Sequence, residues 1–392
     1  MKATSTLFTL TSPRLFLAGI AACLGASLSS PAAAESPEAV AAAEKRREEI
    51  PLGGDFKPNP QVPAFVVAGH GGRILVSKDE GKTWTQAFFG APGADHGVWA
   101  TRTMTYGSGV FVVAFGWGAP TSWLASEDGV RWRHLTAGTA KVPEAKGNPR
   151  IMAGTWGLAA GKGAFVGTGY MSTGATSDLG KTFSSFSLYS FKGDPRGKLN
   201  THHIDPVYCG DASGRFLALG DNRGSDGPKF GHLFASDDLG KTWRWLTPKG
   251  LESSTGRGAI VSNGKLLVMT DADSANAWTS TDAGETWDGP HPTGAKRAVL
   301  SVVGGEFWLT GKPGRASADG TSWRDLPAAV PLGQIIASEK GTLISIHPQR
   351  TNILRSADGG KTWQEVHTYQ PDAIQGGAQG LRDGAFGFLT AK

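Results

Sequence analysis

Apolar residues occur in short runs separated by Gly-rich turns over most of the chain. Many of these runs come in pairs, with a tight turn such as Gly-Ser-Gly between the two members. Short apolar runs bounded by turn residues predict β-strands, and a tight turn between two of them predicts a hairpin. The sequence therefore predicts an all-β fold. The clearest pairs are Trp99–Tyr106 with Val110–Gly116, Arg257–Val261 with Leu266–Thr270, and Gln334–Ala337 with Leu343–His347.

One short motif recurs seven times along the chain and usually follows such a pair. In this turn motif an Asp can accept backbone N–H bonds across a turn, a Gly takes the left-handed conformation, and a final aromatic residue packs between sheets. The motif therefore predicts a repeated strand–turn–strand unit. The copies are Ser77–Trp84, Ser126–Trp132, Thr176–Phe183, Ser236–Trp243, Ser280–Trp287, Ser317–Trp323 and Ser356–Trp363.

These seven motifs resemble the Asp-box (BNR) repeat of sialidase-like β-propellers, and the resemblance covers about residues 64–390. It implies a seven-bladed β-propeller of four-stranded antiparallel blades, with each motif between the third and fourth strands. In broad form the chain is also similar to the Asp-box propeller that assists photosystem II assembly. The resemblance gives the motif aspartates structural roles away from the central site. They are Asp79, Asp128, Asp178, Asp238, Asp282, Asp319 and Asp358.

The two ends of the repeat array predict how the propeller closes. Phe65–Gly69 lacks an innermost strand before it, whereas Ile374–Leu381 follows the last motif without a motif of its own. We therefore expect the chain end to complete the first blade, which closes the ring and removes sheet edges. The run Phe386–Thr390 has no assigned role in this scheme.

Composition and charge exclude several classes of protein. The 392 residues include 56 Gly and 13 Trp, with 19% charged residues, which argues against helical bundles and coiled coils. The formal net charge is +5 and falls to +3 when residues 1–34 and their two cations are removed. A nucleic-acid binder usually has a much stronger basic bias, so we expect no nucleic-acid partner.

Residues 1–34 predict an export signal. A basic, polar start precedes Leu15–Leu28, an apolar run too short to span a bilayer, and Ala32–Ala34 provides a small-residue cleavage site. Residues 20–23 (IAAC) also resemble a bacterial lipoprotein box, in which Cys23 would carry the lipid. Both processing routes stay open. Either places the protein in the periplasm, at the cell surface or outside the cell.

The rest of the chain divides into a charged tether or short helix with a linker, residues 35–63, and a single propeller domain, residues 64–392. Cys209 is the only thiol in the folded body, so no intrachain disulfide can form there. We expect Cys209 to be buried as a small apolar residue. No segment after the export signal could cross a membrane, so the only membrane link would be a lipid at Cys23. We expect a monomer.

The longest intervals between successive motif aspartates end at Asp128, Asp178 and Asp238, so insertions concentrate on blades 2 to 4. Long loops on a rigid scaffold often carry binding sites. Of the Trp residues outside the motifs, Trp99, Trp117 and Trp156 lie in or near these insertions. Aromatic faces beside basic groups suit a sugar or an anionic ligand.

Polar residues of the innermost strands line the channel of a propeller, and several here are arginines. A ring of guanidinium groups would bind a carboxylate, sulfate or phosphate. The alternative is that these arginines pair with acidic residues and only satisfy a polar channel; Asp95, Asp205, Asp211 and Asp273 are available for this. The predicted ligand-binding residues are Arg102, Arg150, Trp156, His203, Asp205, Arg257, Arg297 and Gln334.

The sialidase catalytic set is incomplete. The only Ile-Pro ahead of the first motif is preceded by Glu49 instead of an arginine, and Tyr369 has no evident Glu partner. His203 and Asp205 share one face of a strand, so they could form a general base with its orienting partner, two metal ligands or a plain hydrogen-bonded pair. No third ligand is placed by the sequence, so we predict neither a metal nor a cofactor.

Two functions therefore remain. The favoured one is an exported binding or assembly module that takes a glycan, an anionic ligand or a partner protein at the channel mouth and the loops of blades 2 to 4. The alternative is a glycoside hydrolase or lyase with a non-sialidase catalytic set, for which Asp205 and His203 are the leading candidates. Its two carboxylates would face each other across the channel; the available acids are Asp205, Asp221, Asp271, Asp273 and Glu306.

Overall fold

The computed structural model describes residues 37–51, 55–90, 99–116, 122–135, 155–169, 172–188, 204–220, 232–252, 258–370 and 380–391. All of them belong to one compact unit, Glu35–Lys392. The predicted export signal and Cys23 lie outside the described residues.

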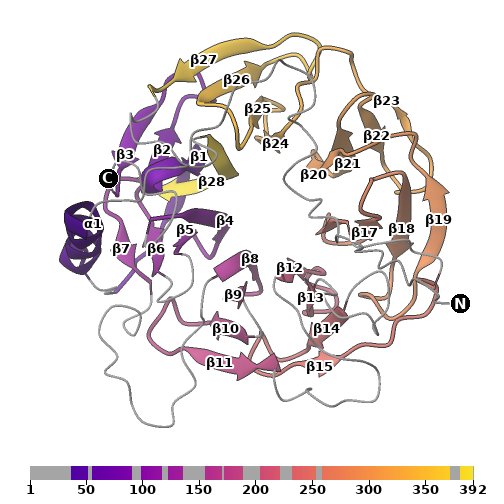
Figure 1. Ribbon diagram of the computed structural model, residues 1–392, viewed down its shortest axis with the longest axis horizontal. Coiled ribbons are helices and arrows are strands. Elements are labelled where there is room, and N and C mark those ends of the chain that lie inside the picture. The colour runs from indigo at the N-terminus through magenta and orange to yellow at the C-terminus, as the bar shows by residue number, and fades with distance from the viewer. Residues whose placement is uncertain are drawn as a thin grey trace, which may run out of the picture. The chain divides into compact units, whose positions relative to one another are not determined.

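Within these residues, 28 strands form seven four-stranded antiparallel sheets arranged as the blades of a propeller (Figure 1). From the inside outward, blade 1 contains β28 (Leu381–Thr390), β1 (Pro60–Gly69), β2 (Arg73–Ser77) and β3 (Thr85–Phe88). Blade 2 contains β4 (Thr101–Gly107), β5 (Val110–Phe115), β6 (Ser122–Ser126) and β7 (Arg133–His134). Blade 3 contains β8 (Thr155–Gly161), β9 (Ala164–Gly169), β10 (Ser172–Thr176) and β11 (Ser184–Ser187).

Blade 4 contains β12 (Ile204–Tyr208), β13 (Phe216–Gly220), β14 (His232–Ser236) and β15 (Arg244–Trp245). Blade 5 contains β16 (Ile260–Ser262), β17 (Leu267–Thr270), β18 (Asn276–Ser280) and β19 (Asp288–Pro292). Blade 6 contains β20 (Val299–Val303), β21 (Glu306–Thr310), β22 (Arg315–Ser317) and β23 (Arg324–Asp325). Blade 7 contains β24 (Gln334–Ala337), β25 (Leu343–Ile346), β26 (Asn352–Ser356) and β27 (Gln364–Thr368). The predicted seven-bladed fold is confirmed.

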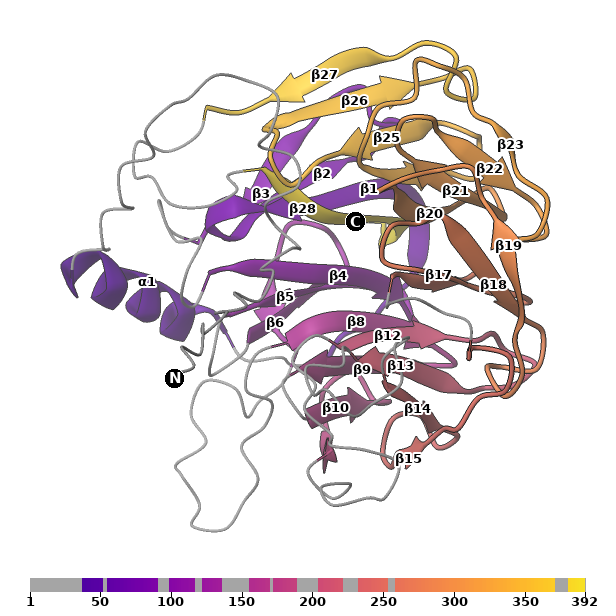
Figure 2. The same ribbon diagram turned by 45° about the vertical axis from the view of Figure 1, so that its right-hand side comes forward.

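The ring closes through β28, the last strand of the chain. β28 pairs with β1 and contacts β4 of blade 2 and β24 of blade 7, and Figure 2 shows it beside β1 and β4. The chain end thus completes blade 1 as expected, but the closing strand is Leu381–Thr390, not Ile374–Leu381. β28 also includes Phe386–Thr390, the run that had no assigned role in the predicted scheme.

Two glycines explain why this strand was hard to recognise. A Cβ on Gly384 would lie 2.4 Å from Ile336 of blade 7, and a Cβ on Gly387 would lie 2.4 Å from the Tyr106 ring of blade 2. Glycine in a strand often marks a close approach of neighbouring structure. In this strand the glycines admit side chains from both adjacent blades and do not form a turn.

Each turn motif joins the third strand of a blade to the fourth, and a hydrogen-bond network fixes its shape. In the first copy, Asp79 Oδ1 accepts from the Ser77 hydroxyl at 2.8 Å and from the Thr83 N–H at 3.0 Å. The Trp84 indole N–H donates to the Gly81 carbonyl at 3.1 Å. Gly81 has a φ of 74° and packs against Ile344 of blade 7, so the motif also seals the joint between blades.

A helix precedes the first strand. α1 (Pro37–Glu49) leads to Ile50, which is buried in a cluster with Trp99 and Trp132 of blades 1 and 2. His134 Nε2 lies 3.0 Å from the Arg47 carbonyl oxygen, which ties the helix end to blade 2. In the part of the chain that the structure describes, no helix is both long and apolar enough to cross a bilayer.

Candidate functional site

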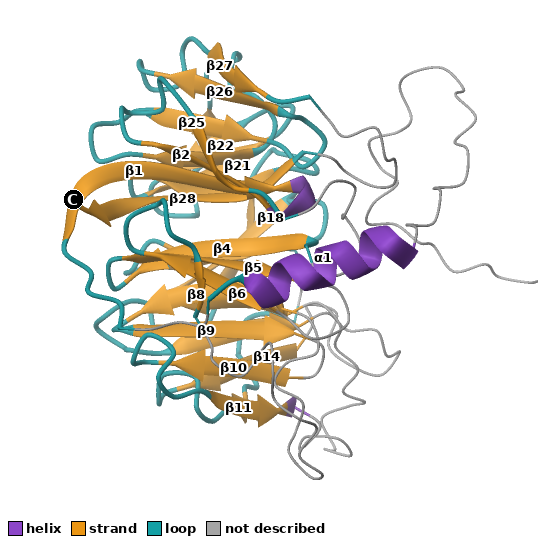
Figure 3. Ribbon diagram, turned by 90° about the vertical axis from the view of Figure 1, so that its left-hand side faces the viewer, coloured by secondary structure: helices purple, strands orange, loops and turns teal. Residues whose placement is uncertain are grey.

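The propeller has two different faces, at the two ends of its strands. We define the mouth face as the one at which the innermost strands begin, where Thr101, Thr155 and Leu381 lie. The opposite turn face carries the seven turn motifs. Figure 3 views the strands from the side, with α1 toward the mouth face. The motif aspartates are therefore remote from the channel mouth, as the resemblance implied.

A β-bulge recurs in three adjacent innermost strands at the mouth face. In β28, β4 and β8 the second residue is left out of the ladder, while its neighbours pair with consecutive residues of the next strand. The three extra residues are Arg382, Arg102 and Trp156, and all are half-buried. Bulges re-aim a side chain and are frequent next to functional sites. Blades 1 to 3 thus present two arginines and one tryptophan at equivalent positions.

Two of these bulge residues are in contact. The Arg102 guanidinium carbon lies 4.8 Å from the centroid of the Trp156 ring, in cation–π geometry. Arg102 Nε also donates to the Gly116 carbonyl at 3.3 Å. Stacking on an indole fixes the plane of a guanidinium, so less side-chain freedom is lost when it binds an anion. The structure therefore brings Arg102 and Trp156 together.

Asp383, which was not among the predicted site residues, follows Arg382 in β28. Its Oδ2 accepts from the Thr103 hydroxyl at 2.9 Å and from the Met104 N–H at 2.8 Å, both in blade 2. Its Oδ1 accepts from Gln334 Nε2 of blade 7 and from the Gly384 N–H, each at 2.8 Å. One carboxyl group thus joins blades 1, 2 and 7.

Burial raises the pKa of Asp383, although the hydrogen bonds from Met104, Thr103 and Gln334 oppose this effect. Arg382 is the residue before Asp383, and Arg102 is the residue before Thr103. The buried contact therefore holds the two arginine-bearing bulges in a fixed relation. Gln334, a predicted ligand-binding residue, serves this contact through its amide nitrogen.

The other predicted site residues fall into two groups. Asp205 is half-buried on β12, and Arg297 lies before β20 in an exposed segment. Arg297 Nε is 4.0 Å from Asp273 Oδ1, so Arg297 follows the ion-pair alternative and does not belong to an innermost strand. A second group lies outside the described residues: Arg150, His203 and Arg257. The His203–Asp205 pair consequently stays a prediction.

Several residues considered for chemistry have structural environments. Trp99 is fully buried against Phe88, at 5.3 Å between ring centroids, so its prediction as a binding Trp is wrong. Its position at the start of a blade next to an insertion was misleading. Cys209 is buried, which raises the pKa of its thiol to about 12 and confirms its assignment as a small apolar residue. The Tyr106 hydroxyl donates to the Phe388 carbonyl at 3.0 Å.

The motif aspartates are ionised structural acceptors. The N–H groups of Ser322 and Thr321 hold the pKa of Asp319 at about 2, and the hydroxyl and N–H of Thr362 do the same for Asp358. Hydrogen bonds to the charged form stabilise it. Among the residues described, no group of three or more His, Cys, Asp or Glu is arranged to hold a metal ion.

Comparison with known proteins supports the fold. A family model described as the DUF6242 beta propeller domain matches residues 246–374, which include blades 5 to 7. No curated protein matches the chain. A solved structure of a candidate 6-phosphogluconolactonase from Bacteroides fragilis is 11% identical, with a TM-score of 0.52, and the match covers 85% of this chain and 99% of that one.

Two further structures are similar. One is a candidate 6-phosphogluconolactonase from Bacteroides uniformis, with 12% identity, a TM-score of 0.51, and 83% and 100% of the two chains covered. The other is YCF48 bound to a D1 peptide, with 14% identity, a TM-score of 0.48, and 88% and 100% covered. For the two candidate 6-phosphogluconolactonase structures, the similarity indicates the β-propeller architecture and no particular activity.

Proposed function

We propose that this chain is an exported binding module that recognises an anionic ligand at its mouth face. The observation that carries this proposal is the repeated bulge, which sets Arg382, Arg102 and Trp156 side by side on three blades. Guanidinium groups bind carboxylates through paired hydrogen bonds, and an indole ring stacks on the apolar face of a sugar. An acidic glycan is therefore the ligand class that fits all three side chains.

The surroundings of the site support binding without catalysis. Asp383, the acid nearest in sequence to the bulges, has both carboxyl oxygens engaged by four donors inside the protein. We therefore assign the Asp383 carboxyl to positioning the residues around it and not to catalysis. The longest insertions of the sequence follow Leu135, Leu188 and Gly220, which are described residues at or next to the mouth-face ends of their strands. They would give such a module its selectivity.

The proposal is tested with tetragalacturonate as the acidic probe and its fully methyl-esterified form as the neutral control. Titration calorimetry of the purified chain lacking residues 1–34 should show saturable binding of the acid form only. Arg102→Ala and Arg382→Ala should each weaken it at least tenfold, and Trp156→Ala should do so as well. Arg244→Ala, on the opposite face, should leave the affinity unchanged.

Two results would count against this function. Equal affinity for the acid and ester forms would exclude recognition through the arginines. Appearance of new reducing ends during incubation would show that the protein cleaves the glycan, which is the hydrolase alternative. Export is a separate part of the proposal, and mass spectrometry of the protein from its native cells would distinguish cleavage after Ala34 from a lipidated Cys23.

A further inference from the structure

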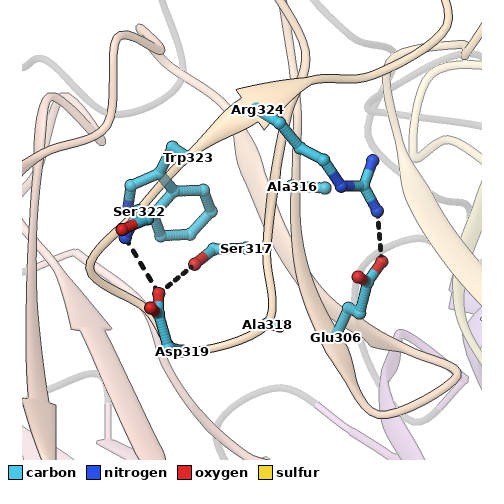
Figure 4. A pocket seen from close by; sticks show the side chains of 8 residues that line it. All are labelled: Glu306, Ala316, Ser317, Ala318, Asp319, Ser322, Trp323 and Arg324. Atoms are coloured by element: carbon cyan, nitrogen blue, oxygen red, sulfur yellow. Dashed lines mark hydrogen bonds and ion pairs between the residues drawn. The ribbon is translucent and has the colours of Figure 1, made fainter.

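An open pocket of about 320 Å³ lies on the turn face of blade 6, around its turn motif, and Figure 4 shows the residues that line it. Its lining includes Glu306, Ala316, Ala318 and Arg324. Arg324 Nη2 donates to Glu306 Oε2 at 2.5 Å and forms one wall. Ala316 is the cross-strand partner of Arg324, so the floor and the wall belong to the same face of the sheet. We call this pocket the blade 6 groove.

The same position in blade 2 is occupied by the chain itself. There Ala125 is the cross-strand partner of Arg133, as Ala316 is of Arg324. Phe56, from the segment before β1, is buried in a cluster with Ala125. The Arg133 guanidinium carbon lies 4.1 Å from the centroid of the Phe56 ring. Blade 2 therefore shows how an extended segment fits this groove, with an aromatic ring on the alanine and under the arginine.

The residues on either side of Phe56 make polar contacts to the same groove. The Lys57 N–H donates to Glu127 Oε2 at 2.5 Å. Asp55 lies 3.4 Å from Lys181 Nζ, in the turn motif of the next blade. An exposed ion pair of this kind contributes little affinity but selects the charge of the partner. In blade 2 the groove thus holds an acidic residue followed directly by an aromatic one.

Blade 4 has the corresponding arginine too; its side chain is 47% exposed and pairs with two acidic residues. Arg244 is the cross-strand partner of Ala235. Glu285, from the turn motif of blade 5, accepts from Arg244 Nη2 at 2.7 Å and from Arg215 Nη1 at 2.9 Å. Asp237 pairs with both arginines as well. All three of these arginines pair with an acid of the protein, and in blade 2 the segment with Phe56 also lies against the arginine.

The described residues leave the blade 6 groove open. We propose that it binds an extended segment of a partner protein in which an acidic residue directly precedes an aromatic residue. The aromatic ring would lie under Arg324, and Lys361 stands in the motif of blade 7 where Lys181 stands in that of blade 3. This surface is on the turn face, so its test is independent of the ligand at the mouth.

The probe is a capped peptide with the sequence of residues 53–60, GGDFKPNP, carrying a fluorescein label for anisotropy titration against the full propeller. We expect saturable binding, and at least tenfold weaker binding when the peptide Phe is replaced by Ala. Arg324→Ala in the protein should weaken binding at least tenfold. Arg244→Ala is the matched control and should have no effect, because Arg244 lies in blade 4, outside the proposed site, where it pairs with Glu285 and Asp237.

A second variant should strengthen the interaction. Ala318 occupies the position of Glu127 in blade 2, so Ala318→Glu supplies the carboxylate that accepts from Lys57 there. Threefold tighter binding is the expected result. Binding unchanged in Arg324→Ala, equal binding of the Phe and Ala peptides, or no binding at millimolar peptide would overturn the proposal. Self-association of the chain that Arg324→Ala abolishes would also overturn it, since a second copy would then be the occupant.

Discussion

Replacing the half-buried Asp383 tests how the ring is held closed. In Asp383→Ala the four donors from Thr103, Met104, Gln334 and Gly384 lose their acceptor. A buried polar group without a partner costs about 1 to 3 kcal/mol. The Thr103 hydroxyl can rotate and the Gln334 amide is half-buried, so the two backbone N–H groups dominate. We expect the free energy of unfolding to fall by about 4 kcal/mol.

Asp383→Asn is the matched comparison, because it keeps the shape and one acceptor oxygen. The Gln334 Oε1 atom is buried and has no hydrogen-bond partner among the described residues. The amide N–H of the introduced side chain can donate to Gln334 Oε1 once the Gln334 side-chain amide flips. The free energy of unfolding should therefore fall by only about 1 kcal/mol in Asp383→Asn. Urea unfolding followed by Trp fluorescence measures both variants; a loss below 1 kcal/mol in Asp383→Ala would refute the role of this contact.

The pH dependence provides an independent check on Asp383. Burial raises its pKa, so the folded chain keeps this proton to a higher pH than the unfolded chain does. Stability therefore falls as the pH rises from the ordinary value of about 4 through the raised pKa. Asp383→Asn lacks this proton, so the difference in unfolding free energy between wild type and variant should change over that window. A constant difference would contradict a buried, proton-binding carboxyl.

Three further predictions concern the rest of the fold. Asp128→Asn should lower the free energy of unfolding in urea by about 1 to 2 kcal/mol at pH 5. Burial raises the pKa of Asp128, but hydrogen bonds from the N–H groups of the following residues lower it more, to about 2. The difference between wild type and variant should therefore shrink as the pH falls toward 2. A double-mutant cycle of Arg215→Met and Glu285→Gln should give a coupling energy of about 1 kcal/mol, and a value of zero would remove this link between blades 4 and 5. Gly387→Ala should lower stability by about 2 kcal/mol, because its Cβ meets the Tyr106 ring; an unchanged melting temperature would show that the ring moves aside freely.

The turn motifs predicted the fold well because each carries its own local hydrogen bonds. Ser77, Asp79 and Gly81 fix a turn with no help from distant residues, so the sequence reveals it directly. The closing strand is different, since its glycines are explained only by Ile336 and Tyr106 in other blades. Contacts between residues far apart in the chain leave no local pattern.

The candidate site was predictable only in part for the same reason. Arg102 and Trp156 were placed correctly relative to each other because the hairpins after them are recognisable. Arg382 and Asp383 were missed, since they belong to the strand whose bounds were wrong. Arg297 lies before β20 and pairs with Asp273, which is the ion-pair alternative that the sequence left open.

The pairing of β1 with β28 also sets the order of events during synthesis. β1 begins at Pro60 and is made early, yet its inner partner is Leu381–Thr390, near the end of the chain. Until β28 has been made, β1 keeps an unpaired edge, and blades 2 and 7 lack the strand between them. Such an edge favours aggregation, and pairing across so long a separation is slow. Until β28 has been made, the inner edge of β1 is therefore a place where another chain could pair with the propeller.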